Sequence, residues 1–495
     1  MSFGVVPSAS AGGASPADRP GPHARDLSRR GFVHLGCVGG GVLGIRSLGL
    51  GSTLRLPFLG GSDAGSAAGS AAPIDVARAA ARWIGEHRRE TAHGVTWPRV
   101  PGDDAGGDLS LYHGSPGVVL FLLELHAQTG DEAALAEAAR GADELIGVLD
   151  SDVPVPPGLY TGLAGMWTAL DRTAVATGAA RYAAGAETCI RRVVETARQV
   201  PSGRMWFDDA LPDASSDIVS GAAGIGLALL AAHARDGGED ALRVAHEVAR
   251  YLVTIGEPQD GGPMWRISPS FPRNYPNFSH GTGGVAYFLA RTARATGDGD
   301  LLAAAVEGGT YLRHVSDCGA DGCLVFHHEP DGEELYYLSW CHGPAGTARL
   351  YHELADATGD TAWSDLVLSG AAATRGQGVP DTRTPGYWNN ISQCCGDAGV
   401  GEFFLALHAL TGDDGHLAYA RHVADWIAGR ADEPDAPVRK WTQAEHRVQP
   451  DMLQAQTGWM QGAAGVGAFF LHLAAREAGR SPFVVLPDSP WGSVL

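Results

Sequence analysis

Residues 113–130 read HGSPGVVLFLLELHAQTG, a turn of small residues followed by an apolar segment that stops at a glycine. Seven segments of the chain begin with such a turn, and the first glycines of successive turns are 48 to 66 residues apart. These glycines are Gly114, Gly162, Gly221, Gly281, Gly343, Gly396 and Gly462. Internal repetition of this length is typical of folds built from repeated structural units. The repeat therefore decides the fold class.

The segments that follow the turns predict helices that are buried on both sides. They run about 13 residues, which is an ordinary helix length, and they are apolar nearly all round. Several end in a glycine that follows a threonine, at the position where a left-handed residue stops a helix. These glycines are Gly130, Gly178, Gly297, Gly359 and Gly412.

Amphipathic stretches rich in Ala, Arg and Glu lie between the apolar segments, for example residues 132–148, 181–200 and 301–315. Their polar faces suit an outer, solvated layer. An open solenoid would need atypical polar repeats at its ends, whereas the last repeat is as complete as the third. We therefore expect an all-α fold in which seven helical hairpins close into a double ring. The turn glycines have no Cβ, so the turns can gather closely at one end of the ring.

Charge and composition exclude several classes of function. The 495 residues carry a net charge of -20, which argues against a nucleic-acid partner. The chain has one lysine, Lys440, and no Gly-Lys-Ser/Thr sequence, which argues against a Walker A phosphate loop.

The N-terminal segment differs from the rest of the chain. Residues 1–60 carry a net charge of +4, against -24 for the remainder. We expect residues 1–73 to be a disordered segment ending in a Gly/Ser/Ala linker, and residues 74–495 to form the folded domain. Ser28-Arg29-Arg30-Gly31-Phe32 resembles a twin-arginine export motif, which predicts an exported protein; the alternative is a basic tail on a cytoplasmic protein. Residues 33–50 are too polar for a stable membrane span.

The side chains just before the turn glycines are candidates for chemistry, because a ring would bring them together at one mouth. They include His113, His280, His342 and Cys395, and Cys341 and Cys394 lie one position further upstream in their turns. Thiolates and imidazoles are the usual zinc ligands, and three protein ligands with one open position are the catalytic pattern. Two adjacent cysteines and a third in the same repeat context therefore predict a metal site.

Three motifs resemble one known family. Ser339-Trp340-Cys341-His342-Gly343, Cys394-Cys395-Gly396 and Asn277-Phe278-Ser279-His280-Gly281 are similar to the signatures of the lanthionine synthetase C-like proteins, the cyclases of lanthipeptide biosynthesis. The resemblance runs from about Ile74 to the C-terminus and implies an α/α toroid. It also implies one zinc ion per chain on Cys341, Cys394 and Cys395, with Cys395 in place of the commoner histidine.

The resemblance implies a thioether-forming enzyme. A zinc-bound thiolate would add to a dehydroalanine or dehydrobutyrine, with His280 as the acid/base and Asp217 orienting or tuning the site. The partner would be a dehydrated peptide or a thiol substrate, and the protein would act as a monomer. Some cyclases have an arginine four residues before the first zinc cysteine, where this chain has Tyr337, although another arginine could substitute.

Other interpretations stay open beside this one. The toroid could bind zinc and a peptide or protein without turning it over, or could process carbohydrates or terpenoids, although glycosidases need paired carboxylates instead of thiols. His280 could bond only to the turn backbone, Asp217 could be a turn cap, and His113 is interpreted as structural.

The remaining cysteines and a histidine pair carry separate predictions. Cys189 reads as a packed core residue. Cys318 and Cys323 flank a hairpin-like loop and could form a disulfide in an exported protein, or remain two free thiols. His327-His328-Glu329 is predicted to be a solvated loop rather than a second metal site.

Overall fold

The computed structural model describes residues 72–103, 107–207 and 214–493. The predicted N-terminal segment with its twin-arginine motif lies outside these residues, apart from its last two positions. Among the helices of the described residues, none combines the length and apolarity that crossing a bilayer requires.

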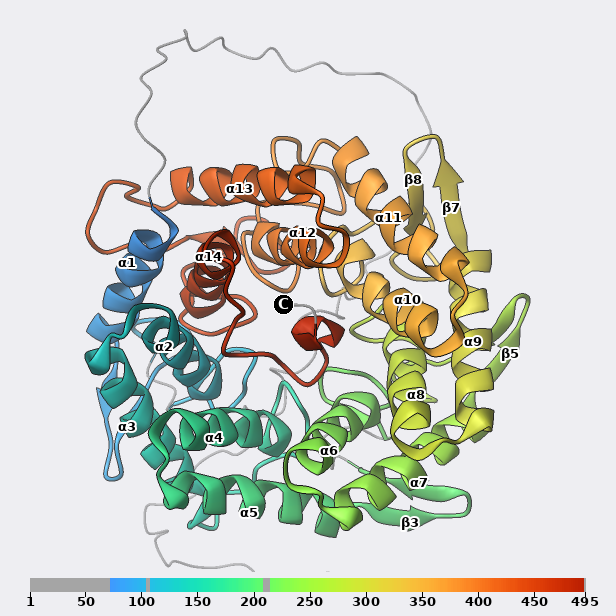
Figure 1. Cartoon of the computed structure of the whole chain (residues 1–495), viewed down its shortest axis with the longest axis horizontal. Helices are drawn as coiled ribbons and strands as arrows, with labels where there is room; N and C mark the ends of the chain where they lie inside the picture. The colour runs from blue at the N-terminus through green and yellow to red at the C-terminus, as the bar shows by residue number, and fades with distance from the viewer. Residues whose placement is uncertain (1–71, 104–106, 208–213, 494–495) are drawn as a thin grey trace, which may run out of the picture. The chain divides into compact units, whose positions relative to one another are not determined.

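Seven helices of the described residues form an inner ring (Figure 1). Each packs against the next in chain order, and the last packs against the first, so the ring is closed. This closure confirms the predicted α/α toroid. The inner helices are α2 (Ser115–Thr129), α4 (Leu163–Thr177), α6 (Ala222–Asp236), α8 (Thr282–Thr296), α10 (Pro344–Thr358), α12 (Asp397–Thr411) and α14 (Ala463–Glu477).

An outer helix packs on each inner helix and completes seven hairpins. In six of them the outer helix follows its inner helix in the chain. In the seventh, the N-terminal helix α1 packs on α14, so segments from opposite ends of the chain close the double ring (Figure 1). The outer helices are α1 (Pro73–Glu86), α3 (Glu132–Leu149), α5 (Ala180–Thr196), α7 (Glu239–Ile255), α9 (Gly299–His314), α11 (Thr361–Gly376) and α13 (Asp414–Gly429).

Burial explains the two kinds of helix. Inner helices such as α2 bury residues on every face, because they lie between the outer layer and the centre. Outer helices such as α7 bury one stripe, here Val244, Val248 and Leu252 among others, and expose the opposite face. Gly130 ends α2 with φ +70°, the left-handed conformation that favours glycine, and the other four predicted stop glycines have the same sign of φ.

Two-stranded antiparallel hairpins connect several of the outer helices to the following turns. The helix predicted to run to residue 200 ends at Thr196 instead. Residues Arg198–Val200 form strand β3, because they pair with Gly203–Met205 across a tight turn, and such pairing overrides local helix propensity. The strands are β1 (Arg89–Glu90), β2 (Val95–Thr96), β3 (Arg198–Val200), β4 (Gly203–Met205), β5 (Glu257–Gln259), β6 (Gly262–Met264), β7 (Ser316–Gly319), β8 (Gly322–Val325), β9 (Gln443–Ala444) and β10 (Leu453–Gln454).

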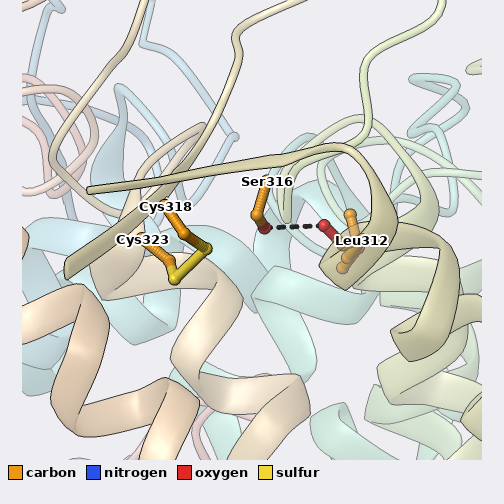
Figure 2. The surroundings of a disulfide bond; sticks show 4 residues. All are labelled: Leu312, Ser316, Cys318 and Cys323. Atoms are coloured by element: carbon orange, nitrogen blue, oxygen red, sulfur yellow. Dashed lines mark hydrogen bonds between the residues drawn. A yellow bond between two sulfur atoms is a disulfide. The ribbon is translucent and has the colours of Figure 1, made fainter.

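Hairpin β7–β8 carries the only disulfide among the described cysteines (Figure 2). Cys318 and Cys323 lie directly opposite each other in the register of the two strands and are bonded. The hydroxyl of Ser316 donates to the carbonyl of Leu312 at 2.7 Å, which ties the start of the hairpin to the end of α9. Of the two alternatives from the sequence, the structure has the disulfide.

The C-terminal segment turns back into the centre of the inner ring, where the short helix η3 (Pro490–Ser493) lies (Figure 1). Asp488 on this segment is buried and accepts hydrogen bonds from Tyr160 Oη at 3.1 Å and Trp340 Nε1 at 3.0 Å. On α2, the Glu124 carboxylate accepts from the backbone N–H groups of residues 483 and 484. The segment therefore packs against several inner helices and supports the turns from within.

Candidate active site

The seven turns are joined by a closed chain of backbone hydrogen bonds. The residue two positions before each turn glycine accepts from a neighbouring turn, at N···O distances between 2.9 and 3.1 Å. The donor and acceptor pairs are Tyr112 to Tyr160, Tyr160 to Val219, Ile218 to Ser279, Ser279 to Cys341, Cys341 to Cys394, Cys394 to Met460, and Met460 to Tyr112. This closed series of hydrogen bonds confirms that the turns gather at one end of the ring. It also places equivalent residues of neighbouring turns side by side.

Glycine is required where a turn meets the preceding loop. A Cβ on Gly281 would lie 1.4 Å from the carbonyl oxygen of Tyr275. No rotation of a side chain could relieve this contact, because the obstructing atom is backbone. The turn can therefore start α8 and present His280 only with glycine at position 281.

The structure brings the three predicted cysteines together. Cys341 Sγ lies 3.2 Å from Cys395 Sγ, and Cys395 Sγ lies 3.4 Å from Cys394 Sγ. All three side chains are buried, and no pair of their sulfur atoms is more than 4.8 Å apart. In a tetrahedral zinc site with Zn–S bonds of about 2.3 Å, sulfurs lie about 3.8 Å apart. The donor set and its spacing therefore fit a metal ion, and no other group of His, Cys, Asp and Glu in the described chain does so.

Two polar side chains point hydrogen-bond donors at these sulfurs. Tyr112 Oη donates to Cys394 Sγ at 3.0 Å, and Gln461 Nε2 donates to Tyr112 Oη at 3.1 Å and lies 4.0 Å from Cys395 Sγ. Donors to a thiolate stabilise its charge. Tyr112 was not among the residues predicted from the sequence, although it occupies the same turn position as Cys341 and Cys394, two residues before the glycine.

His280 and Asp217 form a buried pair. His280 Nδ1 lies 2.5 Å from Asp217 Oδ2, and Asp217 is 1% exposed. The other carboxylate oxygen accepts from the backbone N–H groups of Ser220 at 3.0 Å and Gly221 at 2.6 Å. Asp217 therefore both caps its turn and orients His280. The carboxylate engages Nδ1 of His280 and so fixes the orientation of the ring.

His327 and His328 are buried, so the prediction of a solvated loop is wrong. Backbone hydrogen bonds from His327 N–H to Leu335 O at 2.7 Å and from Glu329 N–H to Asn274 O at 3.0 Å hold the loop inward. The His327 ring lies 4.3 Å from the His342 ring, which lies 5.7 Å from the His280 ring. Burial lowers the pKa of His327 well below its usual value, so its imidazole is neutral at pH 7.

Tyr337 stands beside the thiols and contacts an arginine from a distant loop. Burial raises the pKa of Tyr337 well above its usual value, and the charges of Cys395 and Cys341 raise it further. Arg447, in the loop between β9 and β10, makes a side-chain hydrogen bond with Tyr337 and opposes this rise. The tyrosine ring stacks on His327 with centroids 4.0 Å apart. Arg447 therefore supplies a positive charge on this side of the site, although Tyr337 occupies the position where some cyclases have arginine.

The other predicted residues have simpler surroundings. Cys189 is fully buried in α5, which confirms a core role, and burial raises the pKa of its thiol to about 12. His113 is buried in the first turn and lies 3.2 Å from a carboxylate oxygen of Glu445.

The fold and the site define an α/α toroid with a buried three-thiol centre at the turn end of its inner ring. The chain belongs to the lanthionine synthetase C-like family, whose sequence model matches residues 106–486.

Among solved structures, nisin cyclase is similar in fold, with a TM-score of 0.57 and 16% identity over 83% of this chain and 95% of that one. An α-1,6-mannanase of Salegentibacter sp. HEL1_6 (TM-score 0.43, 14% identity, 82% of this chain and 99% of that one) and an unsaturated glucuronyl hydrolase specific for heparin (0.46, 10%, 83% and 98%) are more distant. At these scores the two hydrolases carry no argument about this chain. No curated protein matches it by sequence.

Proposed function

We propose that the protein is a zinc-dependent enzyme that adds a thiol to a dehydroamino acid and so forms a thioether in a peptide. The observation that carries the proposal is the cluster of three buried sulfurs in the two turns that follow the turn of His280, whose side chain pairs with Asp217. Membership of the lanthionine synthetase C-like family supports the same chemistry. The substrate would be a dehydrated peptide, or a thiol together with a dehydrated protein.

Cys341, Cys394 and Cys395 would hold the zinc ion. Bound there, zinc would lower the pKa of a coordinated substrate thiol, which supplies a thiolate near neutral pH. Tyr112 and Gln461 would disperse part of the negative charge of the three cysteines through their hydrogen bonds. Three thiolate ligands leave more electron density at the site than two thiolates and an imidazole would.

The chain's own residues account for the rest of the reaction. The substrate sulfur forms a bond to the β-carbon of the dehydroamino acid, and the π electrons move onto the adjacent carbonyl as an enolate. Arg447 and Tyr337, which lie on the thiol side of the site, would stabilise this negative charge. His280 Nε2–H then donates a proton to the α-carbon, and Asp217 stabilises the imidazolium that makes the donation possible.

A second candidate is a toroid that binds zinc and a peptide or protein without catalysis. The observation that favours it is Tyr337 at the position where some cyclases have arginine. In this case the sulfur cluster would be structural, and the buried His280–Asp217 pair would only hold the turn.

One experiment separates the two candidates. The zinc-loaded protein is incubated with a dehydrated peptide that contains a free cysteine, and the loss of alkylatable thiol is followed by mass spectrometry. The enzyme should consume the thiol, Cys341→Ala should not, and Cys189→Ala, a buried cysteine away from the cluster, should remain active. Persistence of the thiol with zinc bound to the wild type, with Cys341→Ala altering only metal content, would establish the binding toroid.

Export by the twin-arginine route is the second part of the proposal. The Cys318–Cys323 disulfide supports it, because disulfides persist in oxidising compartments. A reporter fused to residues 1–60 should appear outside the cytoplasm and should stay inside when twin-arginine export is blocked. Retention of the reporter in both conditions would favour the cytoplasmic alternative.

A further inference from the structure

The turn ring places a histidine two turns away from Cys395 in each direction. In ring order, the residues just before the turn glycines are His280, His342, Cys395, Gln461 and His113. Neighbouring turns are joined by single backbone hydrogen bonds of nearly equal length. His280 and His113 are therefore each two turns from Cys395, in opposite directions around the ring.

Contacts connect His113 to the sulfurs on its own side. The ring of His113 lies against the ring of Tyr112, with centroids 4.5 Å apart, and Tyr112 Oη donates to Cys394 Sγ at 3.0 Å. Gln461, in the turn between His113 and Cys395, donates to the same tyrosine hydroxyl. His113 is thus one side chain removed from the thiol cluster.

Each of the two histidines has a buried carboxylate partner. His113 Nε2 lies 3.2 Å from Glu445 Oε1, as His280 Nδ1 lies 2.5 Å from Asp217 Oδ2. Glu445 also forms an ion pair with Arg99 and accepts from Gln456 Nε2 at 2.7 Å. A carboxylate held in this way can stabilise an imidazolium, as the partner of a catalytic histidine does.

Glu445 remains ionised despite its burial. Burial alone would raise the pKa of Glu445, but the hydrogen bond with His113 and nearby positive charge, Arg99 included, outweigh it and lower the value to about 2. Groups near His113 include Glu445, which lies 3.2 Å from Nε2, and Tyr112, whose ring lies against the imidazole; Arg99 and His446 act on Glu445.

We propose that His113, oriented by Glu445, is a second acid/base residue that takes the proton of the incoming thiol, while His280 protonates the α-carbon. This inference rests on the proposed thioether-forming function. The S–H bond breaks, the sulfur keeps the electron pair, and the proton moves to Nδ1 of His113, because Nε2 is engaged by Glu445. After the C–S bond forms, His280 gives its proton to the α-carbon. Solvent returns the proton from His113 to His280 between turnovers, so no proton is gained or lost.

The test counts protons when a thiol binds, without any turnover. Zinc-loaded protein is titrated with 2-mercaptoethanol at one pH in buffers of different ionisation enthalpy, and calorimetry gives the protons released per thiol bound. The wild type should release few protons, because His113 retains them. His113→Gln should release more, approaching about one per thiol, which is the limit for a thiol bound as thiolate. His280→Gln should match the wild type in this count.

The outcomes separate this inference from the proposed function. If the wild type consumes thiol on a dehydrated peptide while His113→Gln releases the same number of protons as the wild type, His113 is not the proton acceptor and the enzyme proposal stands. If the wild type binds no thiol, the proposed function fails as well. Glu445→Gln keeps the imidazole and should give an intermediate count. Loss of zinc or of the melting transition in both variants would make the pair structural and overturn the inference.

Discussion

At the scale of single residues, the site is defined by sulfur and by the donors that face it. Cys395 stands one position from Cys394, so two of the three sulfurs come from one turn and the third from the neighbouring turn. Their backbone is held at the start of α12, where Cys394 takes part in the closed series of hydrogen bonds between turns. Tyr112 and Gln461 then come from two further turns.

Replacing Cys395 should show whether it is a ligand. Cys395→Ala should lose most of the metal, because two protein ligands bind zinc much more weakly than three, and Cys395→His should keep it, because imidazole is also a usual zinc ligand. Metal analysis of the purified proteins measures both, with Cys189→Ala as the matched control. One zinc per chain in Cys395→Ala would remove this residue from the ligand set.

Removing the Tyr112 hydroxyl should weaken the metal site without dismantling it. Tyr112→Phe loses the donor to Cys394 Sγ and keeps the ring that packs in the turn. Loss of such an outer hydrogen bond lowers metal affinity by about 10- to 100-fold. Competition with a zinc chelator measures the change, and Tyr182→Phe, in the outer helix α5, should leave the affinity unaltered. An unaltered zinc affinity in Tyr112→Phe would show that this hydrogen bond does not contribute to metal binding.

At the scale of elements, the ring closes at a seam where α12, α14 and α2 meet. His472 on α14 lies 2.7 Å from Glu402 on α12 through Nδ1 and 3.9 Å from Glu124 on α2 through Nε2. Burial by itself lowers the pKa of His472, but the charge and hydrogen bond of Glu402 and the charge of Glu124 raise it to about 9. A single charged imidazole thus bridges three inner helices.

Because this seam depends on a charged His472, the protein should become less stable as the pH rises. The folded-state pKa of His472 exceeds its unfolded value of about 6.5, so its contribution is complete below that pH and is lost as pH rises through about 9. A shift of this size corresponds to about 3 kcal/mol. Denaturant unfolding of the wild type should weaken between these pH values, whereas His472→Gln should start less stable and change less. Parallel pH curves for the two proteins would contradict this account.

At the scale of the whole molecule, the toroid depends on contact between the two ends of its chain. α1 packs on α14 as the seventh outer helix, and without it the outward face of α14 would be uncovered. α1 turns one apolar stripe toward α14, with Trp83 and Ile84 buried and Arg78 exposed. The C-terminal segment contacts inner-ring residues through Asp488 and residue 483.

Weakening α1 should therefore destabilise the whole ring rather than one helix. Trp83→Ala should lower the free energy of unfolding by about 3–5 kcal/mol, the usual cost of removing a large buried aromatic side chain. Arg78→Ala, on the exposed face of the same helix, should cost at most about 1 kcal/mol, since its ion pair with Asp75 is on the surface. Chemical denaturation followed by circular dichroism measures both. Equal effects of the two substitutions would mean that α1 does not close the ring.

The sequence by itself determined the repeat, the two layers of helices and the three cysteines. Periodic turns, helix-stop glycines and apolar segments act locally, so they can be read residue by residue, and the site residues that precede the turn glycines inherit their positions from the repeat. His280 was a candidate for the same reason, whereas its acid/base role and the choice of Asp217 came only from the resemblance to the family.

Only the tertiary structure decided which segments from distant parts of the chain complete the site and the ring. Arg447 meets Tyr337, Glu445 meets His113, the loop of His327 folds inward, and α1 covers α14. None of these pairs has a periodic relation in the sequence. Each partner lies outside the turns, and its position depends on loop closure and packing across the whole ring, which local residue patterns do not encode.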